Sequence, residues 1–352
     1  MAWITKARKP PPRLDALLRD ALAQYEDAAL KIWPGLDKVL RGLVNEASMS
    51  RMVEAFRTGQ LRLVDGAIDW ASLGAALSKE LGPGIRSALE EGGRLALRQT
   101  PGVVHLDWQV LDPFVTNYMA THLPTLIREV TDETRAAVRL ATRMAYEQGM
   151  GPMAAARTIR GSIGLTTKQA QAVMSFRAGV IDAAERDLGV DYLHRNWAMS
   201  RDVVRSSRQV TLANADKLAS AYQRRAVMGR AMVIARTEGV RAVSAGRKAF
   251  WQEAMQVGAL DPAHHEMMWL ASPSERTCDI CMRLHKTTVP VGSSFPDGDP
   301  PLHPSCRCDV RIVDARKGRT SAAAARTDER IRQIEQERAA AEDRRREAQQ
   351  AI

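Results

Sequence analysis

Residues 277–285 read TCDICMRLH and residues 300–308 read PPLHPSCRC, and these two segments contain all four cysteines of the 352-residue chain. The first segment holds a C-x2-C pair, and the second holds a histidine and two cysteines. Two ligand groups joined by a loop are typical of tetrahedral zinc sites, because each group supplies two ligands at little cost in loop closure. The pattern therefore predicts a structural zinc ion bound by four of five residues: Cys278, Cys281, His303, Cys306 and Cys308.

The spacing leaves the ligand set open. An all-cysteine site fits, and so does a site of three cysteines with His303 in which only one residue of the C-x-C pair binds. A closed sphere of four ligands leaves no position for catalysis, whereas three protein ligands would leave one for a water molecule and make hydrolysis conceivable. Disulfides across the same pairs are the other interpretation, although clustered cysteines in a chain that opens without a secretory signal favour metal. The neighbouring His264 and His265 are interpreted as surface-loop residues, and His285 as facing the site without binding.

The composition predicts a mainly α-helical protein. Aromatic residues make up only 5% of the chain, whereas a β-rich fold would need more aromatic and β-branched residues. We expect elongated helical N-terminal and central regions, a small loop-rich α+β module stapled by zinc near the C-terminus, and a charged helical tail. No run of about 18 apolar residues occurs, so no membrane span is expected.

Helix-breaking and helix-capping residues mark the expected helices. Pro34-Gly35 and Gly82-Pro83-Gly84 are expected to end helices, and a further break is expected near Met228-Gly229. Thr131 is expected to begin a long helix, and Thr166 or its neighbour to cap another.

The chain changes character near residue 260, where proline, glycine and serine become frequent. Short strands are expected near residues 269–271, 289–291 and 310–313. Such a small module buries little core of its own and usually needs a metal or disulfide staple. The expected organisation is an N-terminal helical region (1–130), a central helical region (131–258), the Cys/His zinc module (259–315) and a charged helical or disordered tail (316–352).

The net charge of +10 is concentrated in one stretch. Residues 195–248 contain twelve Lys or Arg residues and three acids, which gives 12 − 3 = +9. Such a region indicates a polyanionic neighbour, although a solvated helical face would explain it equally well. Aromatic stacking residues are not interleaved, so any nucleic-acid contact is expected to be to phosphates and to be salt-sensitive. The residues predicted to make it are Arg201, Arg205, Arg208, Arg224, Arg225 and Arg230.

Enzyme motifs are missing from the sequence. No phosphate-binding G-x-x-x-x-G-K-[ST], G-x-S-x-G or H-E-x-x-H pattern occurs. Glu238, an acid among many basic residues, is interpreted first as the partner of Arg241 in a helical ion pair. A buried bridge to the zinc module is the second interpretation, and a catalytic carboxylate is a weak third because no second acid lies at a useful spacing.

The order of these motifs resembles the head morphogenesis domain of tailed bacteriophages, whose members are minor head proteins similar to that of phage Mu. The resemblance covers roughly residues 131–315 and includes the stretch Gly161–Ala170. Two departures are Ser272-Pro273-Ser274, where members often carry an acid, and His285-Lys286, where they often carry a glycine. The residues that carry the resemblance are the helical Arg236, Thr237 and Glu238, the strand residue Trp269, and the two Cys/His segments.

The resemblance implies a minor capsid protein without enzyme activity. It would be assembled in the host cytoplasm and lie in the virion, inside the capsid at the portal vertex. The implied partners are the phage portal protein, a major capsid or scaffold protein, and packaged double-stranded DNA held by phosphate contacts. The implied role is in head assembly and in DNA retention or ejection. The alternatives are a zinc-dependent nuclease or toxin-like enzyme on the same domain, and a DNA-binding regulator with a zinc ribbon.

Overall fold

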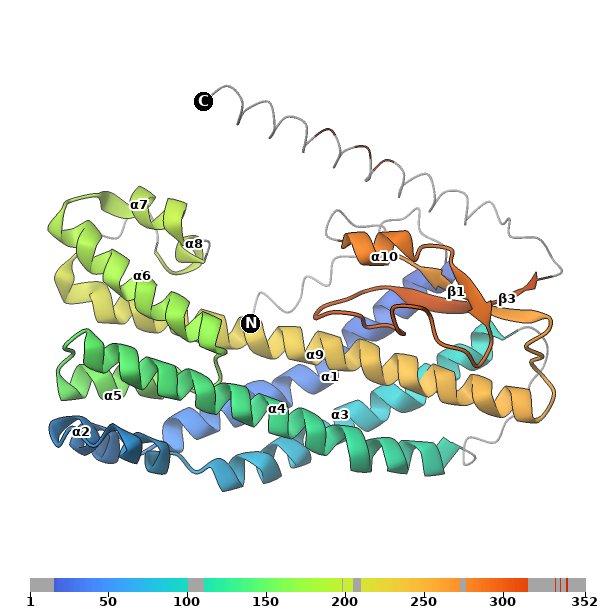
Figure 1. Ribbon diagram of the computed structural model, residues 1–352, viewed down its shortest axis with the longest axis horizontal. Coiled ribbons are helices and arrows are strands. Elements are labelled where there is room, and N and C mark those ends of the chain that lie inside the picture. The colour runs from blue at the N-terminus through green and yellow to red at the C-terminus, as the bar shows by residue number, and fades with distance from the viewer. Residues whose placement is uncertain are drawn as a thin grey trace. The chain divides into compact units, whose positions relative to one another are not determined.

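The computed structural model describes residues 16–100, 111–197, 199–204, 210–272 and 277–315, and three single residues further on. Almost all of the expected charged tail lies outside the described residues. Within them the protein is mainly α-helical with one small sheet, which confirms the predicted fold class (Figure 1).

Helices make up most of the described chain. Their bounds are α1 (Ala16–Glu46), α2 (Met49–Arg57), η1 (Leu61–Ala67), α3 (Trp70–Gln99), α4 (Asp112–Glu147), α5 (Pro152–Gly161), α6 (Thr167–Glu185), α7 (Gly189–Asn196), α8 (Ser200–Val203), η3 (Leu212–Asn214), α9 (Ala215–Gln256) and α10 (Asp279–Arg283). No helix in these described ranges is long and apolar enough to cross a membrane.

Contacts divide the chain into two compact units. Unit 1 takes in the described residues of segments 1–32, 83–118 and 234–352, and unit 2 takes in those of segments 33–82 and 119–233. Each unit therefore combines segments that are far apart in the sequence. The division of the chain into four consecutive segments stays a prediction.

The predicted helix breaks at the Pro-Gly motifs are wrong. α1 continues through Pro34, and α3 continues through Pro83. The glycines beside these prolines allow close packing instead: a Cβ at Gly35 would lie 2.6 Å from the carbonyl oxygen of Glu80. Likewise, a Cβ at Gly84 would lie 3.1 Å from the carbonyl oxygen of Lys31. A proline inside a helix costs about 3 kcal/mol, and packing at such close approaches can offset that cost.

Two other expected helix boundaries are also absent. Thr131 lies inside α4, where its hydroxyl donates to the carbonyl of Ile127 at 2.7 Å rather than capping a helix start. This back-bonding satisfies the threonine within the helix and removes its value as a boundary signal. α9 runs without interruption past Gly229, which has open space around it.

The remaining local signals are confirmed. Thr166 caps α6 in a capping box with Gln169, in which each side chain bonds the backbone of the other. The three strands are β1 (His265–Leu270), β2 (Thr288–Pro290) and β3 (Asp309–Asp314), close to their predicted positions.

Unit 2 has an aromatic-centred core between α6, α7 and α9. Phe176 stacks on Tyr222 with ring centroids 4.4 Å apart, and the edge of Trp197 meets Phe176 at 5.8 Å. Gly179 leaves room for the Trp197 ring, since a Cβ there would lie 2.1 Å from it. This core fixes α7 and the basic end of α9 within one unit.

The small sheet belongs to unit 1, and its strand order is β2-β1-β3 with both pairings antiparallel (Figure 1). Trp269 of β1 is fully buried, and its ring meets Phe295 edge-on at 5.3 Å. The same core includes Phe250 and Trp251 of α9 together with three of the four cysteines. The Cys/His segments are therefore built into a core shared with α9.

Candidate metal centre

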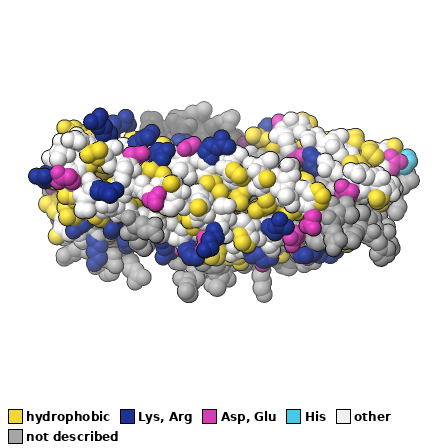
Figure 2. Space-filling model, turned by 90° about the horizontal axis from the view of Figure 1, so that it is seen from below, with side chains coloured by type: hydrophobic (Ala, Val, Ile, Leu, Met, Phe, Trp, Pro, Cys, Tyr) yellow, Lys and Arg dark blue, Asp and Glu magenta, His cyan; other side chains and the backbone are white. Residues whose placement is uncertain are grey.

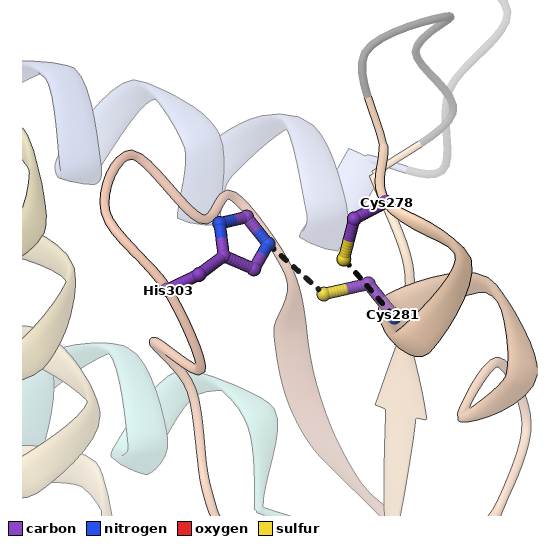
Figure 3. Close-up of side chains that lie close together, drawn as sticks. All are labelled: Cys278, Cys281 and His303. Carbon is purple, nitrogen blue, oxygen red and sulfur yellow. Dashed lines mark hydrogen bonds between the residues drawn. The ribbon is translucent and has the colours of Figure 1, made fainter.

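The first ligand pair lies at the start of α10. Cys278 is the N-cap residue of this helix, and its sulfur accepts a hydrogen bond from the backbone N–H of Cys281 at 3.4 Å. The two cysteines of the C-x2-C pair thus lie at the N-terminus of a helix, and both sulfurs point to the same side (Figure 3).

The second ligand pair lies on a tight turn. The N–H of Cys306 donates to the carbonyl of His303 at 3.1 Å, which closes the four-residue turn. Pro304 occupies its second position, and Ser305 occupies the third with φ of 59°. Proline followed by a residue with positive φ is the pattern of a type II turn. The turn brings the backbones of His303 and Cys306 together, while their donor atoms fall in different groups of the cluster.

His303 is held in the tautomer that a metal ligand needs. Its Nδ1 lies 3.0 Å from the carbonyl oxygen of Pro304, and because a carbonyl oxygen only accepts, Nδ1 carries the proton in the neutral ring and Nε2 keeps its lone pair. That Nε2 atom lies 3.4 Å from the sulfur of Cys281, across the gap between the two segments (Figure 3).

The donor atoms form two groups of three that share Cys281. One group adds Cys278 and His303, and the other adds Cys306 and Cys308, with the donor atoms of each group within 4.8 Å of one another. Ligands on a tetrahedral zinc ion are about 3.5–3.8 Å apart, given bond lengths of about 2.0–2.3 Å. The sulfurs of Cys281 and Cys306 are 3.9 Å apart, so the observed spacing is close to that of a zinc sphere. The cluster could therefore bind a metal ion.

The cysteines are free thiols that share hydrogen bonds. A hydrogen bond from Cys281 lowers the pKa of the Cys306 thiol, and the same bond raises the pKa of Cys281.

The other histidines lie outside these two groups. His285 uses its Nδ1 to accept from the N–H of Ala271 at 3.2 Å, which ties the segment after α10 to the residue that follows β1. His264 is about half exposed and lies 3.8 Å from the carboxylate of Asp261. His265 is the first residue of β1 and not a surface-loop residue as expected, and its Nδ1 bonds the backbone of Asp261.

The helical Arg236-Thr237-Glu238 motif contacts the second ligand segment. The Thr237 hydroxyl accepts a hydrogen bond from the N–H of Ser305 at 3.0 Å. Glu238 is buried and bonds Arg241 at 2.6 Å, which is the ion pair expected from the sequence. Thr237 thus makes the contact with the module that the sequence had suggested for Glu238.

A buried polar network follows directly after the last cysteine and was not predicted. Asp309 is fully buried and pairs with the guanidinium of Arg247, which is 2% exposed. The hydroxyl of Tyr25 donates to Asp309 at 2.7 Å, and Arg247 also donates to Gln99 at 2.8 Å. A buried ion pair of this kind is costly to break, at about 3–5 kcal/mol. The sequence offered only one faint signal, an aspartate at the start of a strand.

A small cavity borders this network. Its volume is about 30 Å³, and its lining includes Arg247, Trp251 and Val310. Such a volume holds about two water molecules, which is too little for an organic ligand.

The predicted phosphate-contacting arginines have different environments. Arg201 and Arg224 are exposed, whereas Arg225 bonds Asp202 at 3.1 Å. Arg230 is only 4% exposed and bonds Thr134 and Glu133, so its guanidinium does not contribute to the exposed basic surface. Two further predicted residues, Arg205 and Arg208, lie outside the described ranges. On the face shown in Figure 2, basic side chains are interspersed with acidic ones.

The fold and the site define a helical protein whose C-terminal sheet module carries a Cys/His cluster. Residues 213–311 match a family model described as Phage Mu protein F like protein, and this segment includes all of α9 and all five candidate ligands. The match confirms the resemblance to the phage head morphogenesis family over that segment. A match to a phage head family suggests a component of the virion. No curated protein and no solved structure gives a significant match to the chain.

Proposed function

We propose that the protein is a minor capsid protein that associates with the portal vertex and with packaged DNA, and that acts in head assembly and in DNA retention or ejection. The observation that carries the proposal is the family match over the segment that joins α9 to the Cys/His module. The Thr237–Ser305 bond supports it, because it joins two separate parts of the family motif in one folded unit. The proposed role is binding rather than catalysis.

The proposal assigns zinc a structural role, with Cys278, Cys281, His303 and Cys306 as ligands. These four residues form two x2-spaced pairs, each closed by a local backbone turn. Four protein ligands would fill a tetrahedral sphere and leave no open position for chemistry. When bound, the ion would join α10 to the turn before β3 and so stabilise a module with little core of its own.

Metal analysis of the purified full chain tests this assignment. One zinc ion per chain is expected, and Cys306→Ser is expected to lose it. Cys308→Ser is the matched control, because it makes the same change at a buried cysteine two residues away. If the Cys308→Ser variant keeps its zinc ion and the His303→Ala variant loses it, the proposed ligand set is supported. The reverse pattern supports the all-cysteine set.

Quantitative mass spectrometry of purified particles tests the location in the virion. A few copies per portal ring, together with co-purification with the portal protein, are expected. Absence from mature virions but presence in infected cells would contradict a virion role and point to a transient assembly factor or an enzyme. Plasmid cleavage by the wild-type protein that is lost in His303→Ala would favour the nuclease alternative.

The proposed DNA contact is electrostatic and is carried by exposed arginines of unit 2. Reversing Arg201 and Arg224 to glutamate should weaken DNA binding at low salt. Each phosphate contact contributes about 0.9 to the log–log slope of affinity against salt, so the slope should fall by about 2. Arg62 and Arg128, exposed arginines on η1 and α4, provide a matched double reversal. Equal effects of the two pairs would indicate general charge attraction instead of a defined surface.

A further inference from the structure

We infer that Tyr25 and Glu26, two consecutive residues of α1, are positioning residues of the metal centre. The inference rests on the proposed zinc site and extends it to a helix outside the family-matched segment 213–311. α1 is far from the cysteines in the sequence, but its first half belongs to unit 1 together with the module.

The first contact fixes the chain where it leaves the second ligand segment. The hydroxyl of Tyr25 donates to Asp309 at 2.7 Å and accepts from Arg247 at 3.2 Å. All three side chains are at least 96% buried. A buried hydrogen-bonded group of this kind holds its members in one geometry, because any displaced member would leave an unpaired polar atom out of reach of water.

The second contact fixes the residue between Cys306 and Cys308. Arg307 lies 3.5 Å from the carboxylate of Glu26, and the same carboxylate lies 3.5 Å from Arg236 of α9. Arg307 is 44% exposed, so this contact is weaker than the buried one. It nevertheless links the ligand segment to the same turn of α1.

These contacts alternate with the candidate ligands along the chain. Residues 305, 307 and 309 bond α9 or α1, while Cys306 and Cys308 belong to the donor cluster. The helices thus hold every second residue of the segment, including the two residues that flank the proposed ligand Cys306. Groups that orient ligands from outside the coordination sphere typically contribute 10- to 100-fold to metal affinity.

The experiment measures zinc affinity of the full chain by competition with a chromophoric chelator. Tyr25→Phe removes one hydroxyl and should lower zinc affinity about 10-fold, and Glu26→Gln should lower it a few-fold. Asp27→Asn is the matched control for the acid-to-amide change, because Asp27 pairs with Lys31 on the surface of the same helix. Tyr222→Phe is the control for the hydroxyl, because Tyr222 is buried in the core of unit 2. Both controls should retain wild-type affinity.

A spectroscopic measurement separates positioning from general stability. The visible bands of the Co²⁺-substituted protein report the geometry of thiolate ligands, and they should change in Tyr25→Phe at temperatures where circular dichroism shows an intact fold. If Glu26 acts through Arg307, the Glu26→Gln/Arg307→Gln double variant should bind zinc no more weakly than the weaker single variant.

Equal affinities in the two α1 variants and their controls would overturn the inference while leaving the zinc site in place. A wild-type protein that binds no zinc would overturn both the metal assignment and this inference. If Tyr25→Phe does not fold, Glu26→Gln provides the same comparison, because its partially exposed contacts can be lost without unfolding.

Discussion

Substitution of Gly246 by alanine should destabilise unit 1 strongly, although alanine is the better helix former. Gly246 lies in α9, where a Cβ would be 1.9 Å from the carbonyl oxygen of Leu89 in α3. The contact is reciprocal, because a Cβ at Gly92 of α3 would lie 2.1 Å from the carbonyl oxygen of Val243. The two helices therefore pack backbone to backbone at this crossing.

The magnitude follows from the distance. Ordinary contact begins at 3.4 Å, so the two backbones would have to separate by about 1.5 Å. Overpacking typically costs about 1–3 kcal/mol, and a backbone atom cannot move aside as a side chain can. The higher helix propensity of alanine offsets at most about 1 kcal/mol of this loss of stability. Separation would also shift the adjacent Arg247 away from Asp309, so we expect a net loss of about 2–3 kcal/mol.

Thermal unfolding and hydrogen exchange of α9 amides would measure this loss. A fall in the unit 1 transition of about 5–8 °C is expected for a unit of this size. Gly229→Ala is the matched control, since it makes the same change in the same helix where a Cβ meets open space. It should be neutral or stabilising by up to about 1 kcal/mol. Equal stability of the two variants would refute the close-packing argument.

Three further predictions concern the metal module and the buried tyrosines. Ser305→Gly should retain zinc and stability, whereas Ser305→Val should lower the free energy of unfolding by about 1–2 kcal/mol. The reason is that the backbone φ of 59° at this position suits glycine and opposes a branched side chain. Denaturant unfolding of the two variants measures the difference, and equal stabilities would contradict it. Removal of zinc by a chelator should lower the melting temperature of unit 1, and re-addition of zinc should restore it; an unchanged melting curve would argue against a structural ion. Burial raises the pKa of Tyr25, Tyr118 and Tyr222. Above about pH 10 the tyrosines of the unfolded chain ionise, while those of the folded protein stay protonated. The contribution of the three buried phenols to the free energy of unfolding is therefore complete below about pH 10 and should decline above it. A melting temperature that does not fall between pH 9 and 11 would contradict this.

The sequence by itself determined the features that depend on neighbours along the chain. The Cys/His spacing predicted a cluster whose sulfurs and imidazole do face one another, because the C-x2-C and His303–Cys306 pairs are each closed by a local turn. The capping box at Thr166 and the three short strands were predictable for the same reason. Local hydrogen bonds and side-chain periodicity require no knowledge of the remaining fold.

Only the tertiary structure decided where the long helices continue and what holds the metal segment. Pro34 and Pro83 would end isolated helices, but packing at the neighbouring glycines offsets their cost. Tyr25 and Asp309 are 284 residues apart, and no local pattern connects them. Their bond exists because the first half of α1, the end of α9 and β3 belong to one unit, and a buried aspartate there requires partners from whichever elements the fold brings near.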